Sequence, residues 1–235
     1  MNPLTRHIVL PIRDFIYPPL CFTCNRLLSE DEHRVCSSCW RSFTRVDPSH
    51  PAWIGIKGRF DLEGVVGDLV SCFLFEKGGK LQDVIHELKY RGMKSLGVRL
   101  GEEIGNHIAR NPELRKADWL IPVPLHRLKQ RERGYNQSEY VCRGIARVSG
   151  IPSGGTFIRR HKYTETQAQL TVEQRRENVG NAFTIPANRR PFVNGKTCIL
   201  VDDVITTGST IGACARELRK NNAAGVFAAS VALAP

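Results

Sequence analysis

The sequence predicts an α/β protein, a doubly wound parallel sheet preceded by a small cysteine-rich module. Three observations predict this fold class. From residue 68 onward, short apolar segments alternate with segments of helical periodicity, an order typical of parallel sheets covered by helices. Four cysteines in two close pairs precede these segments. A chain of 235 residues with 41% hydrophobic content can bury one sizeable core and support a small extra module.

The two cysteine pairs predict a metal site. Eleven residues separate the knuckle Cys21-x-x-Cys24 from the knuckle Cys36-x-x-Cys39. Four thiolates complete the tetrahedral shell of a structural zinc ion, so we expect a zinc-binding module over residues 1–45. Two disulfides are one alternative, disfavoured in a reducing compartment, and a thioredoxin-like redox pair is another, disfavoured because no βαβ unit precedes it. The remaining cysteines stand singly in apolar contexts and are expected in the core: Cys72, Cys142, Cys198 and Cys214.

The first half of the main domain, which we expect over residues 61–235, follows a proposed linker at 46–60. That linker is inferred from prolines and glycines without clean periodicity. A β-rich run at 68–75 predicts a strand. Two helices should follow, the first with apolar residues at helical spacing up to Gly92 and the second with an apolar residue every four positions up to the Asn-Pro pair at 111–112.

The second half continues the alternation of strands and helices. The strand in "DWLIPVPL" (118–125) should end near Pro122, because proline cannot donate a ladder hydrogen bond. A helix over 136–150 should begin at a cap formed by Asn136 or Ser138. The remaining expected elements are strands at 155–160, 197–203 and 225–233 and a helix at 209–222.

The segment "ILVDDVITTGST" (199–210) joins a buried strand to a helix and predicts a phosphate site. Ligands of parallel sheets bind beyond the carboxyl ends of the strands, where this segment must lie. Asp202 and Asp203 can serve one ligand if the strand ends there, since side chains on a regular strand alternate between faces. The positions from Thr206 to Thr210 offer hydroxyls, backbone N–H groups and a helix N-terminus to one phosphate.

The plainer alternative is that the aspartates only end the strand and that the hydroxyls only cap the helix. So many polar groups in one loop argue against it. The segment contains neither a Walker A loop nor a G-x-G-x-x-G motif.

A net charge of +11 indicates anionic partners, and it does not choose among nucleic acid, a membrane surface and polyphosphates. Basic residues concentrate at 126–134 and at 159–162, and a solvated face is the alternative for each. No apolar stretch reaches the roughly 20 residues of a membrane span, and the N-terminus is a poor signal peptide. We therefore expect a cytoplasmic protein, and a place near the inner face of the membrane is left open.

The segment at 199–210 resembles the signature loop of type I phosphoribosyltransferases, which bind phosphoribosyl pyrophosphate (PRPP). Nearly the whole chain resembles the ComF/GntX competence-protein family. Besides the four-cysteine module, this resemblance rests on "HELKYRG" (86–92), "PVPLHRLKQRERGYNQ" (122–137) and "RRHKYTETQAQLTVEQRRENVGNAF" (159–183). It implies a type I phosphoribosyltransferase fold for the sheet domain.

The resemblance also implies roles for individual residues. Asp202 and Asp203 would contact the ribose hydroxyls, and Thr206, Thr207, Gly208, Ser209 and Thr210 would hold the 5′-phosphate. Mg²⁺ would arrive with PRPP, bound mostly through its oxygens and waters. The pyrophosphate would meet one or more of three arginines, Arg127, Arg131 and Arg133. Residues 159–183 correspond to a mobile hood loop, in which Thr166, Gln167, Arg175 and Asn178 are the most motif-like. No catalytic residue is assigned.

Two hypotheses of function follow. The first, which the family resemblance favours, is a PRPP-binding protein that handles single-stranded DNA during natural transformation, with other DNA-uptake proteins as possible partners. The second is an active phosphoribosyltransferase with an unidentified base or amine acceptor. A purely structural zinc adaptor would leave the phosphate loop unexplained. The DNA-binding candidates are Arg127, Lys129, Arg131, Arg133, Tyr135, Arg159, Arg160 and Lys162, and for Tyr135 a place in the core is an equal alternative.

Overall fold

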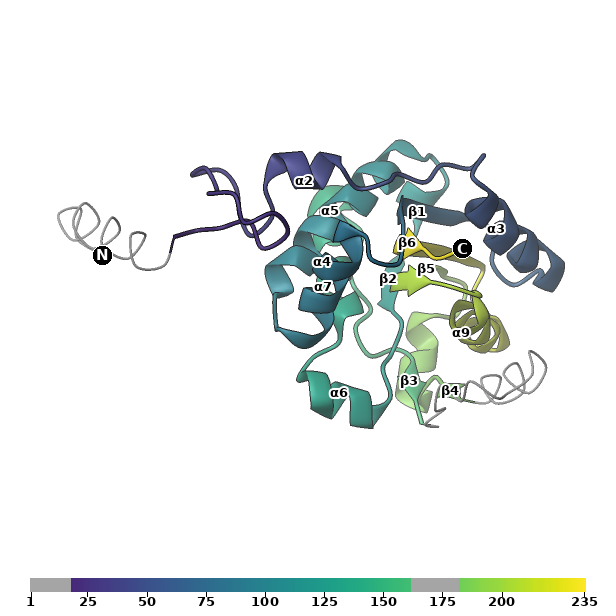
Figure 1. Cartoon of the computed structure of the whole chain (residues 1–235). Helices are drawn as coiled ribbons and strands as arrows, with labels where there is room; N and C mark the ends of the chain where they lie inside the picture. Colours follow the sequence, from purple (N-terminus) through teal and green to yellow (C-terminus); the bar gives the residue numbers. More distant parts are fainter. Residues whose placement is uncertain (1–17, 162–181) are drawn as a thin grey trace, which may run out of the picture.

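A four-stranded parallel sheet forms the centre of the protein. The computed structural model describes residues 18–161 and 182–235. The strand order is β1-β6-β5-β2, with bounds Leu69–Leu74, Gly225–Leu233, Thr197–Ile205 and Trp119–Pro122 (Figure 1). Helices cover both faces of this sheet, so the predicted doubly wound α/β fold is confirmed.

One face of the sheet is covered by α4 (Lys80–Tyr90), α5 (Lys94–Arg110) and α7 (Gln137–Ser149). Helices α5 and α7 touch almost backbone to backbone. A methyl group at Gly101 would lie 2.1 Å from the carbonyl oxygen of Val141, and one at Gly144 would lie 2.0 Å from that of Val98. Both positions therefore require glycine, and the close contact fixes the position of α7 beside α5 on this face of the sheet.

The other face is covered by α9 (Ser209–Lys220) and α3 (Pro51–Glu63). Helix α3 occupies most of the segment that we expected to be a linker, so an irregular linker over 46–60 is wrong. Its proline stands at the first helical position, where no hydrogen bond is lost, and Gly64 ends it with a positive φ of 63°. Ile56 and Phe60, one helical turn apart, are buried against the sheet.

Most other elements agree with their sequence predictions. Helix α7 begins after Asn136, which caps it by accepting from the backbone N–H of Ser138. Strand β5 continues to Ile205, two residues beyond the predicted end at 203. The expected strand at 155–160 is reduced to β3 (Arg159–Arg160), because it pairs only with the equally short β4 (Phe183–Thr184). Between β2 and α7 lies α6 (Arg127–Arg133), and short 3-10 helices lie at Leu114–Lys116 and Ala187–Phe192.

The N-terminal module, with its short helix α2 (Ser37–Arg41), lies beside α5 (Figure 1). The Trp40 indole N–H donates to the Glu103 carboxylate at 2.8 Å, and the Arg99 guanidinium lies 3.9 Å from the centre of the Trp40 ring. Arg99 also donates to the Val35 carbonyl at 3.1 Å. These contacts attach the module to the sheet domain. Within the described ranges, no helix combines the length and apolarity needed to cross a membrane.

Candidate functional site

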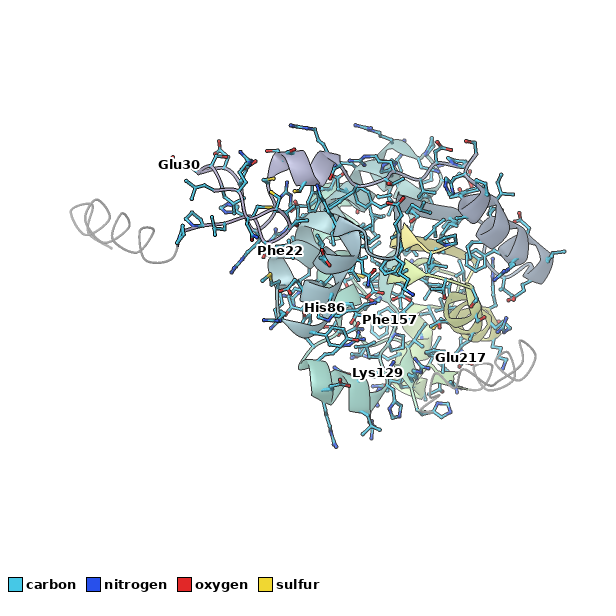
Figure 2. The ribbon with its side chains drawn as sticks, viewed as in Figure 1. Phe22, Glu30, His86, Lys129, Phe157 and Glu217 are labelled. Carbon is cyan, nitrogen blue, oxygen red and sulfur yellow. The ribbon has the colours of Figure 1, made fainter. Side chains whose placement is uncertain are left out.

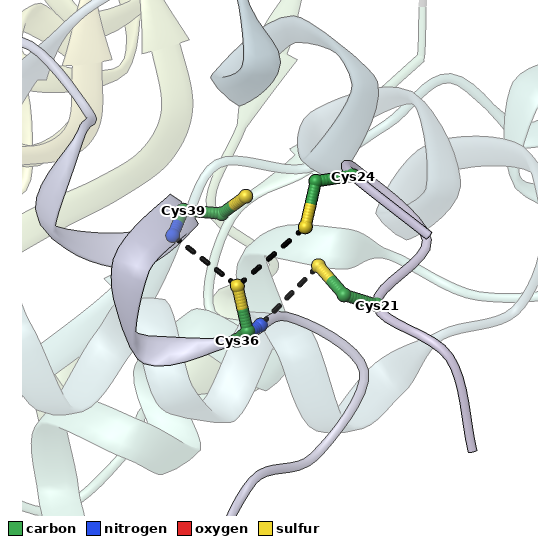
Figure 3. A group of neighbouring side chains, drawn as sticks. All are labelled: Cys21, Cys24, Cys36 and Cys39. Atoms are coloured by element: carbon green, nitrogen blue, oxygen red, sulfur yellow. Dashed lines mark hydrogen bonds between the residues drawn. The ribbon is translucent and has the colours of Figure 1, made fainter. Parts of the chain in front are cut away.

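The four paired cysteines converge on one point. Their sulfur atoms all lie within 4.8 Å of one another, and the side chains point toward a common centre (Figure 3). All four are free thiols, which does not favour the disulfide alternative. Four sulfurs fit the closed tetrahedral shell of structural zinc, with no position left for a substrate. The residues thus suit the predicted zinc ion, which would tie the two knuckles together.

Backbone N–H groups donate hydrogen bonds to two of these sulfurs and so favour the thiolate form that binds a cation. The N–H of Cys36 donates to the sulfur of Cys21 at 3.3 Å, and that of Cys39 donates to the sulfur of Cys36 at 3.4 Å. The Cys39 N–H bond is the main cause that lowers the pKa of Cys36 to about 6, whereas burial and the neighbouring thiols raise the pKa of Cys39 to about 12. Without a metal, Cys36 and Cys39 thus differ in how readily each becomes a thiolate. A cation at the centre would remove this difference, because it favours the thiolate form of all four cysteines.

Glu32 holds the two knuckles in register, a role that sequence reasoning missed. Its carboxylate accepts from the backbone N–H of Ser37 at 2.7 Å and from the Ser37 hydroxyl, next to the second knuckle. Its other oxygen lies 2.7 Å from the guanidinium of Arg26, just after the first knuckle. The Ser37 hydroxyl and N–H, more than Arg26, lower the pKa of Glu32 to about 2.

The four single cysteines are all buried in the core, as predicted: Cys72, Cys142, Cys198 and Cys214.

The predicted phosphate loop is the turn from β5 into α9. Gly208 has a φ of 74°, a left-handed conformation that favours glycine, and lies over the Phe60 ring so closely that a methyl group would come within 2.8 Å. The hydroxyls of Thr207 and Ser209 are 2.9 Å apart. Together with Asp202, the loop residues line a hollow of about 40 Å³ at the N-terminus of α9. Backbone N–H groups, hydroxyls and a helix N-terminus thus face one small space.

Helix α3 supports this loop from outside. The Arg59 guanidinium donates to the carbonyl oxygen of Thr207 at 3.2 Å. One turn later, Glu63 lies 2.5 Å from the guanidinium of Arg216 on α9. Arg59 brings a positive charge to the rim of the phosphate loop. No local sequence pattern indicates this contact, because it depends on helix α3, which lies mostly in the predicted linker.

Asp202 and Asp203 occupy different environments, contrary to the expectation that both lie at a strand end. Asp203 is only 4% exposed, and its Oδ2 lies 3.0 Å from the Lys89 ammonium. Asp202 lines the hollow, and its Oδ1 accepts from the Ser138 hydroxyl at 3.3 Å. Burial first, and then the neighbouring Asp203 carboxylate, raise the pKa of Asp202 to about 7. The carboxylate facing the hollow is therefore easily protonated in the empty site.

The basic segment forms α6, whose position is marked by Lys129 in Figure 2. Arg127 and Arg131 are exposed, whereas Arg133 donates to Gln137 at 2.9 Å and lies 5.1 Å from the centre of the Tyr90 ring. Beside α6 is a cavity of about 520 Å³. Its ionisable lining residues are Arg127, Glu139, Arg159, Arg160 and His161. Among the described residues, members of both predicted basic segments, 126–134 and 159–162, line this cavity.

Tyr135 is not available for base stacking, which corrects its place among the DNA-binding candidates. It is 8% exposed, its hydroxyl donates to the Leu88 carbonyl, and its ring meets Tyr140 edge-on at 5.4 Å. The exposed aromatic residue of this region is Tyr90, at 52% exposure. Lys162 and the hood-loop residues Thr166, Gln167, Arg175 and Asn178 lie outside the described residues.

Two protein families match the chain. Residues 135–235, which contain the phosphate loop, match the phosphoribosyl transferase domain, and residues 12–52, which contain all four paired cysteines, match the double zinc ribbon domain. These two matches agree with the two parts of the structure.

Several named proteins are similar to this chain. Competence protein F of Haemophilus influenzae is 39% identical over 111 residues, 47% of this chain and 48% of that protein. DNA utilization protein YhgH of Escherichia coli is 28% identical over 219 residues, 89% and 94% of the two chains. Competence protein ComFC of Bacillus subtilis is 30% identical over 211 residues, 88% of this chain and 81% of that protein. With this coverage, and with a zinc ribbon followed by a phosphoribosyltransferase-type sheet, the chain belongs to the ComF family of competence proteins.

Proposed function

We propose that this protein binds PRPP with Mg²⁺ at the β5–α9 loop and acts in DNA uptake, where it handles incoming single-stranded DNA in the cytoplasm. The observation that carries the PRPP part is the hollow in which Asp202 meets the loop from Thr206 to Thr210. The names of the relatives, competence protein and DNA utilization protein, support the DNA part.

The loop suits the 5′-phosphate of PRPP. Successive N–H groups at the start of α9 carry the partial positive charge of the helix dipole, and Thr207 and Ser209 add hydroxyl donors. Arg59 contributes a full positive charge from α3. Asp202, on the same hollow, would accept hydrogen bonds from ribose hydroxyls.

The pyrophosphate of PRPP would lie toward the cavity beside α6. Of the three candidate arginines, Arg127 lines this cavity and Arg131 is exposed on the same helix, whereas Arg133 already contacts Gln137 and Tyr90. Arg127 is therefore the strongest candidate for the pyrophosphate. Its planar guanidinium matches phosphate oxygens two at a time, and Mg²⁺ on the phosphates would offset their remaining charge.

The basic residues of α6 and β3, beside the same cavity, suit the phosphate backbone of single-stranded DNA. Arg127, Lys129 and Arg131 on α6 and the pair Arg159 and Arg160 on β3 supply its charge. Tyr90, exposed beside Arg133, replaces Tyr135 as the aromatic residue on which a base could stack. Binding of this kind follows charge and stacking, so it should be insensitive to sequence.

An active phosphoribosyltransferase is the second candidate, and the volume of the cavity favours it. About 520 Å³ is enough for a base or amine acceptor beside PRPP. Transfer would break the bond from C1 to pyrophosphate through an oxocarbenium-like state, and arginines at the cavity would stabilise the departing pyrophosphate. In this candidate, Asp202 would hold the ribose while C1 reacts.

Calorimetric titration with PRPP and Mg²⁺ tests the proposal. We expect saturable binding by the native protein and its severe loss in Asp202→Asn, because the ribose contact loses its charge. An absence of heat for the native protein would contradict PRPP binding. Pyrophosphate release, measured with a panel of bases and with DNA, separates the two candidates: release that depends on one base would establish the enzyme.

A further inference from the structure

An aromatic stack runs from the edge strand β2 to the surface of the protein. The Trp119 ring on β2 meets the Phe157 ring at a centroid distance of 5.0 Å, and the Phe157 ring stacks on the Phe192 ring at 5.6 Å with 29° between their planes. Phe157 is buried, whereas Phe192, at the end of the 3-10 helix Ala187–Phe192, is 45% exposed. The outermost ring of this stack is therefore open to one more flat ring.

The turn that carries Phe192 is rigid. Pro186 comes directly before the 3-10 helix and Pro191 lies within it, and each proline fixes its own φ. Directly after Phe192, Val193 is fully buried, and its N–H donates to the Arg190 carbonyl at 3.1 Å. Phe192 is thus held in place before a ligand arrives, which lowers the entropy that binding costs.

Two arginines flank the exposed ring. The Arg189 guanidinium lies 5.9 Å from the ring centres of both Phe157 and Phe192, and Arg190 is exposed. The sequence from 185 to 196 contains no acidic residue, and the salt bridges of the described residues include neither arginine. Arg189, Arg190 and Phe192, called the Phe192 patch below, therefore combine an open aromatic ring with two unpaired positive charges.

The Phe192 patch adjoins the basic surface beside α6. Phe157, which packs against Phe192, is labelled in Figure 2. The residues on either side of it, among them Thr156 and Arg159, line the cavity of about 520 Å³ that Arg127 of α6 also lines. The segment 155–161 therefore joins the cavity to the patch. A polynucleotide bound at α6 and β3 could continue onto the patch.

We propose that the Phe192 patch is a second contact for single-stranded DNA, in which one base stacks on Phe192 and neighbouring phosphates meet Arg189 and Arg190. The inference rests on the DNA part of the proposed function and adds a surface separate from α6 and Tyr90. Every base has a π-face, so such a contact accepts any sequence. One exposed ring offers little apolar area to a second protein or a membrane, whereas two cations beside it favour a polyanion with flat bases.

Fluorescence anisotropy with a labelled oligothymidylate tests the ring. Phe192→Leu keeps an apolar side chain over Phe157 but cannot stack on a base. It should weaken DNA binding about tenfold, within the usual effect of losing one stacked base, and should change thermal stability little. Leu62→Ala is the matched control, because Leu62 is an exposed apolar residue of α3, and it should bind DNA normally.

The salt dependence of the same binding tests the charges. Arg190→Ala should reduce the slope of log K against log salt by about 0.7, the value for one phosphate contact on a single strand. Arg110→Ala, exposed at the end of α5 on the other face of the sheet, is the matched control and should leave the slope unchanged.

Phe192→Trp gives a readout that a packing role alone would not change. The indole ring can stack on a base, so this variant should keep the affinity for DNA. Its emission should be quenched by the oligonucleotide more strongly than that of the native protein. In a variant that combines Phe192→Leu with Tyr90→Ala, the two losses of affinity should multiply, because separate contacts contribute independently. Losses that do not multiply would mean that both rings serve one base, and they would overturn the second contact.

Further results would overturn the inference and leave the DNA function intact. One is binding that Phe192→Leu and Arg190→Ala leave unchanged while Arg131→Ala weakens it. Another is loss of self-association in the ultracentrifuge, or of binding to vesicles of anionic lipid, when Phe192→Leu leaves DNA binding unchanged. These results would assign the patch to a second copy of the chain or to a membrane. A native protein that binds no oligonucleotide would instead overturn the DNA part of the proposed function, and this inference with it.

Discussion

The guanidinium of Arg59 donates a hydrogen bond to the carbonyl oxygen of Thr207, 3.2 Å away, and so connects helix α3 to the phosphate loop. Phe60, the next residue, packs under Gly208 of the same loop. The helix after the zinc module therefore supports the loop of the proposed PRPP site from outside. This contact makes the phosphate loop dependent on a segment far from it in the sequence.

Arg59→Ala should weaken PRPP binding about fivefold, the effect of losing roughly 1 kcal/mol from one exposed charge-assisted hydrogen bond and its charge. The unfolding temperature should change little, because Arg59 is exposed. Calorimetric titration with PRPP and Mg²⁺ measures the affinity. Lys57→Ala is a control on the same helix, since Lys57 pairs with Asp61 instead of the loop. An equal effect of the two changes would show that general charge, and not the contact with Thr207, matters.

Asp202→Asn should stabilise the empty protein, and more at pH 8 than at pH 5. Burial and Asp203 raise the pKa of Asp202 from 3.8 to about 7, while Lys89 and Ser138 oppose the shift. Between pH 3.8 and about pH 7 the folded state holds a proton that the unfolded state releases. The contribution of Asp202 therefore lowers the stability of the folded state as the pH rises through this range, and it is fully unfavourable above about pH 7.

Because asparagine has no charge at any of these pH values, the variant should melt roughly 3 °C or more above the native protein at pH 8, a shift of about 1 kcal/mol in a chain of this size. Thermal unfolding without ligand at both pH values measures this. The thiol of Cys214 also faces Asp202, and it stays neutral in this range because burial raises its pKa. An equal difference at the two pH values would contradict the raised pKa of Asp202.

Glu32→Gln should speed the loss of zinc without removing a ligand. The carboxylate joins Arg26 to Ser37 across the two knuckles, and the loss of such supporting contacts typically costs about 10- to 100-fold in metal affinity. Zinc transfer to a chromophoric chelator gives the rate, and metal analysis should find one zinc per chain beforehand. Glu30→Gln, exposed on the same loop, is the control and should behave like the native protein (Figure 2). Zinc retained equally by both variants would refute the role of Glu32.

Local patterns in the sequence predicted the parts of this protein that depend on neighbouring residues. The cysteine knuckles, the phosphate loop and the apolar periodicity of α4 and α5 are contained within short segments, and the structure places them as expected. Helix α3 was missed because Pro51, Gly55 and Gly58 suggest a loop, although a proline at the first helical position costs no hydrogen bond.

The contacts that shape the site join distant segments. The pair of Lys89 and Asp203, the bond from Arg59 to Thr207 and the burial of Tyr135 all depend on which helix packs beside which strand. A single sequence contains no periodicity that reports such pairings. Sequence reasoning therefore predicted the residues of the proposed phosphate loop but not helix α3, which supports it, and it could not decide between core and surface for Tyr135.

Single-stranded DNA should bind through α6 and Tyr90 by two separable contributions. Arg131→Ala should lower the affinity and reduce the salt dependence by about 0.7 in the slope of log K against log salt, the value for one phosphate contact on a single strand. Tyr90→Ala should weaken binding by about 1–3 kcal/mol, the usual effect of losing one stacked base, and should leave the slope unchanged. Fluorescence anisotropy with a labelled oligonucleotide over a series of salt concentrations measures both quantities.

Tyr135→Phe is the control for Tyr90, because the buried ring remains and only the hydrogen bond to Leu88 is lost. It should lower thermal stability and leave the affinity for DNA unchanged. The exposed ring of Tyr90 lies beside Arg133, so a base stacked there would place its phosphate near α6. A slope that Arg131→Ala does not change would remove α6 from the DNA path. Binding that Tyr90→Ala leaves intact, at salt concentrations where the phosphate contacts are weak, would rule out stacking on this residue.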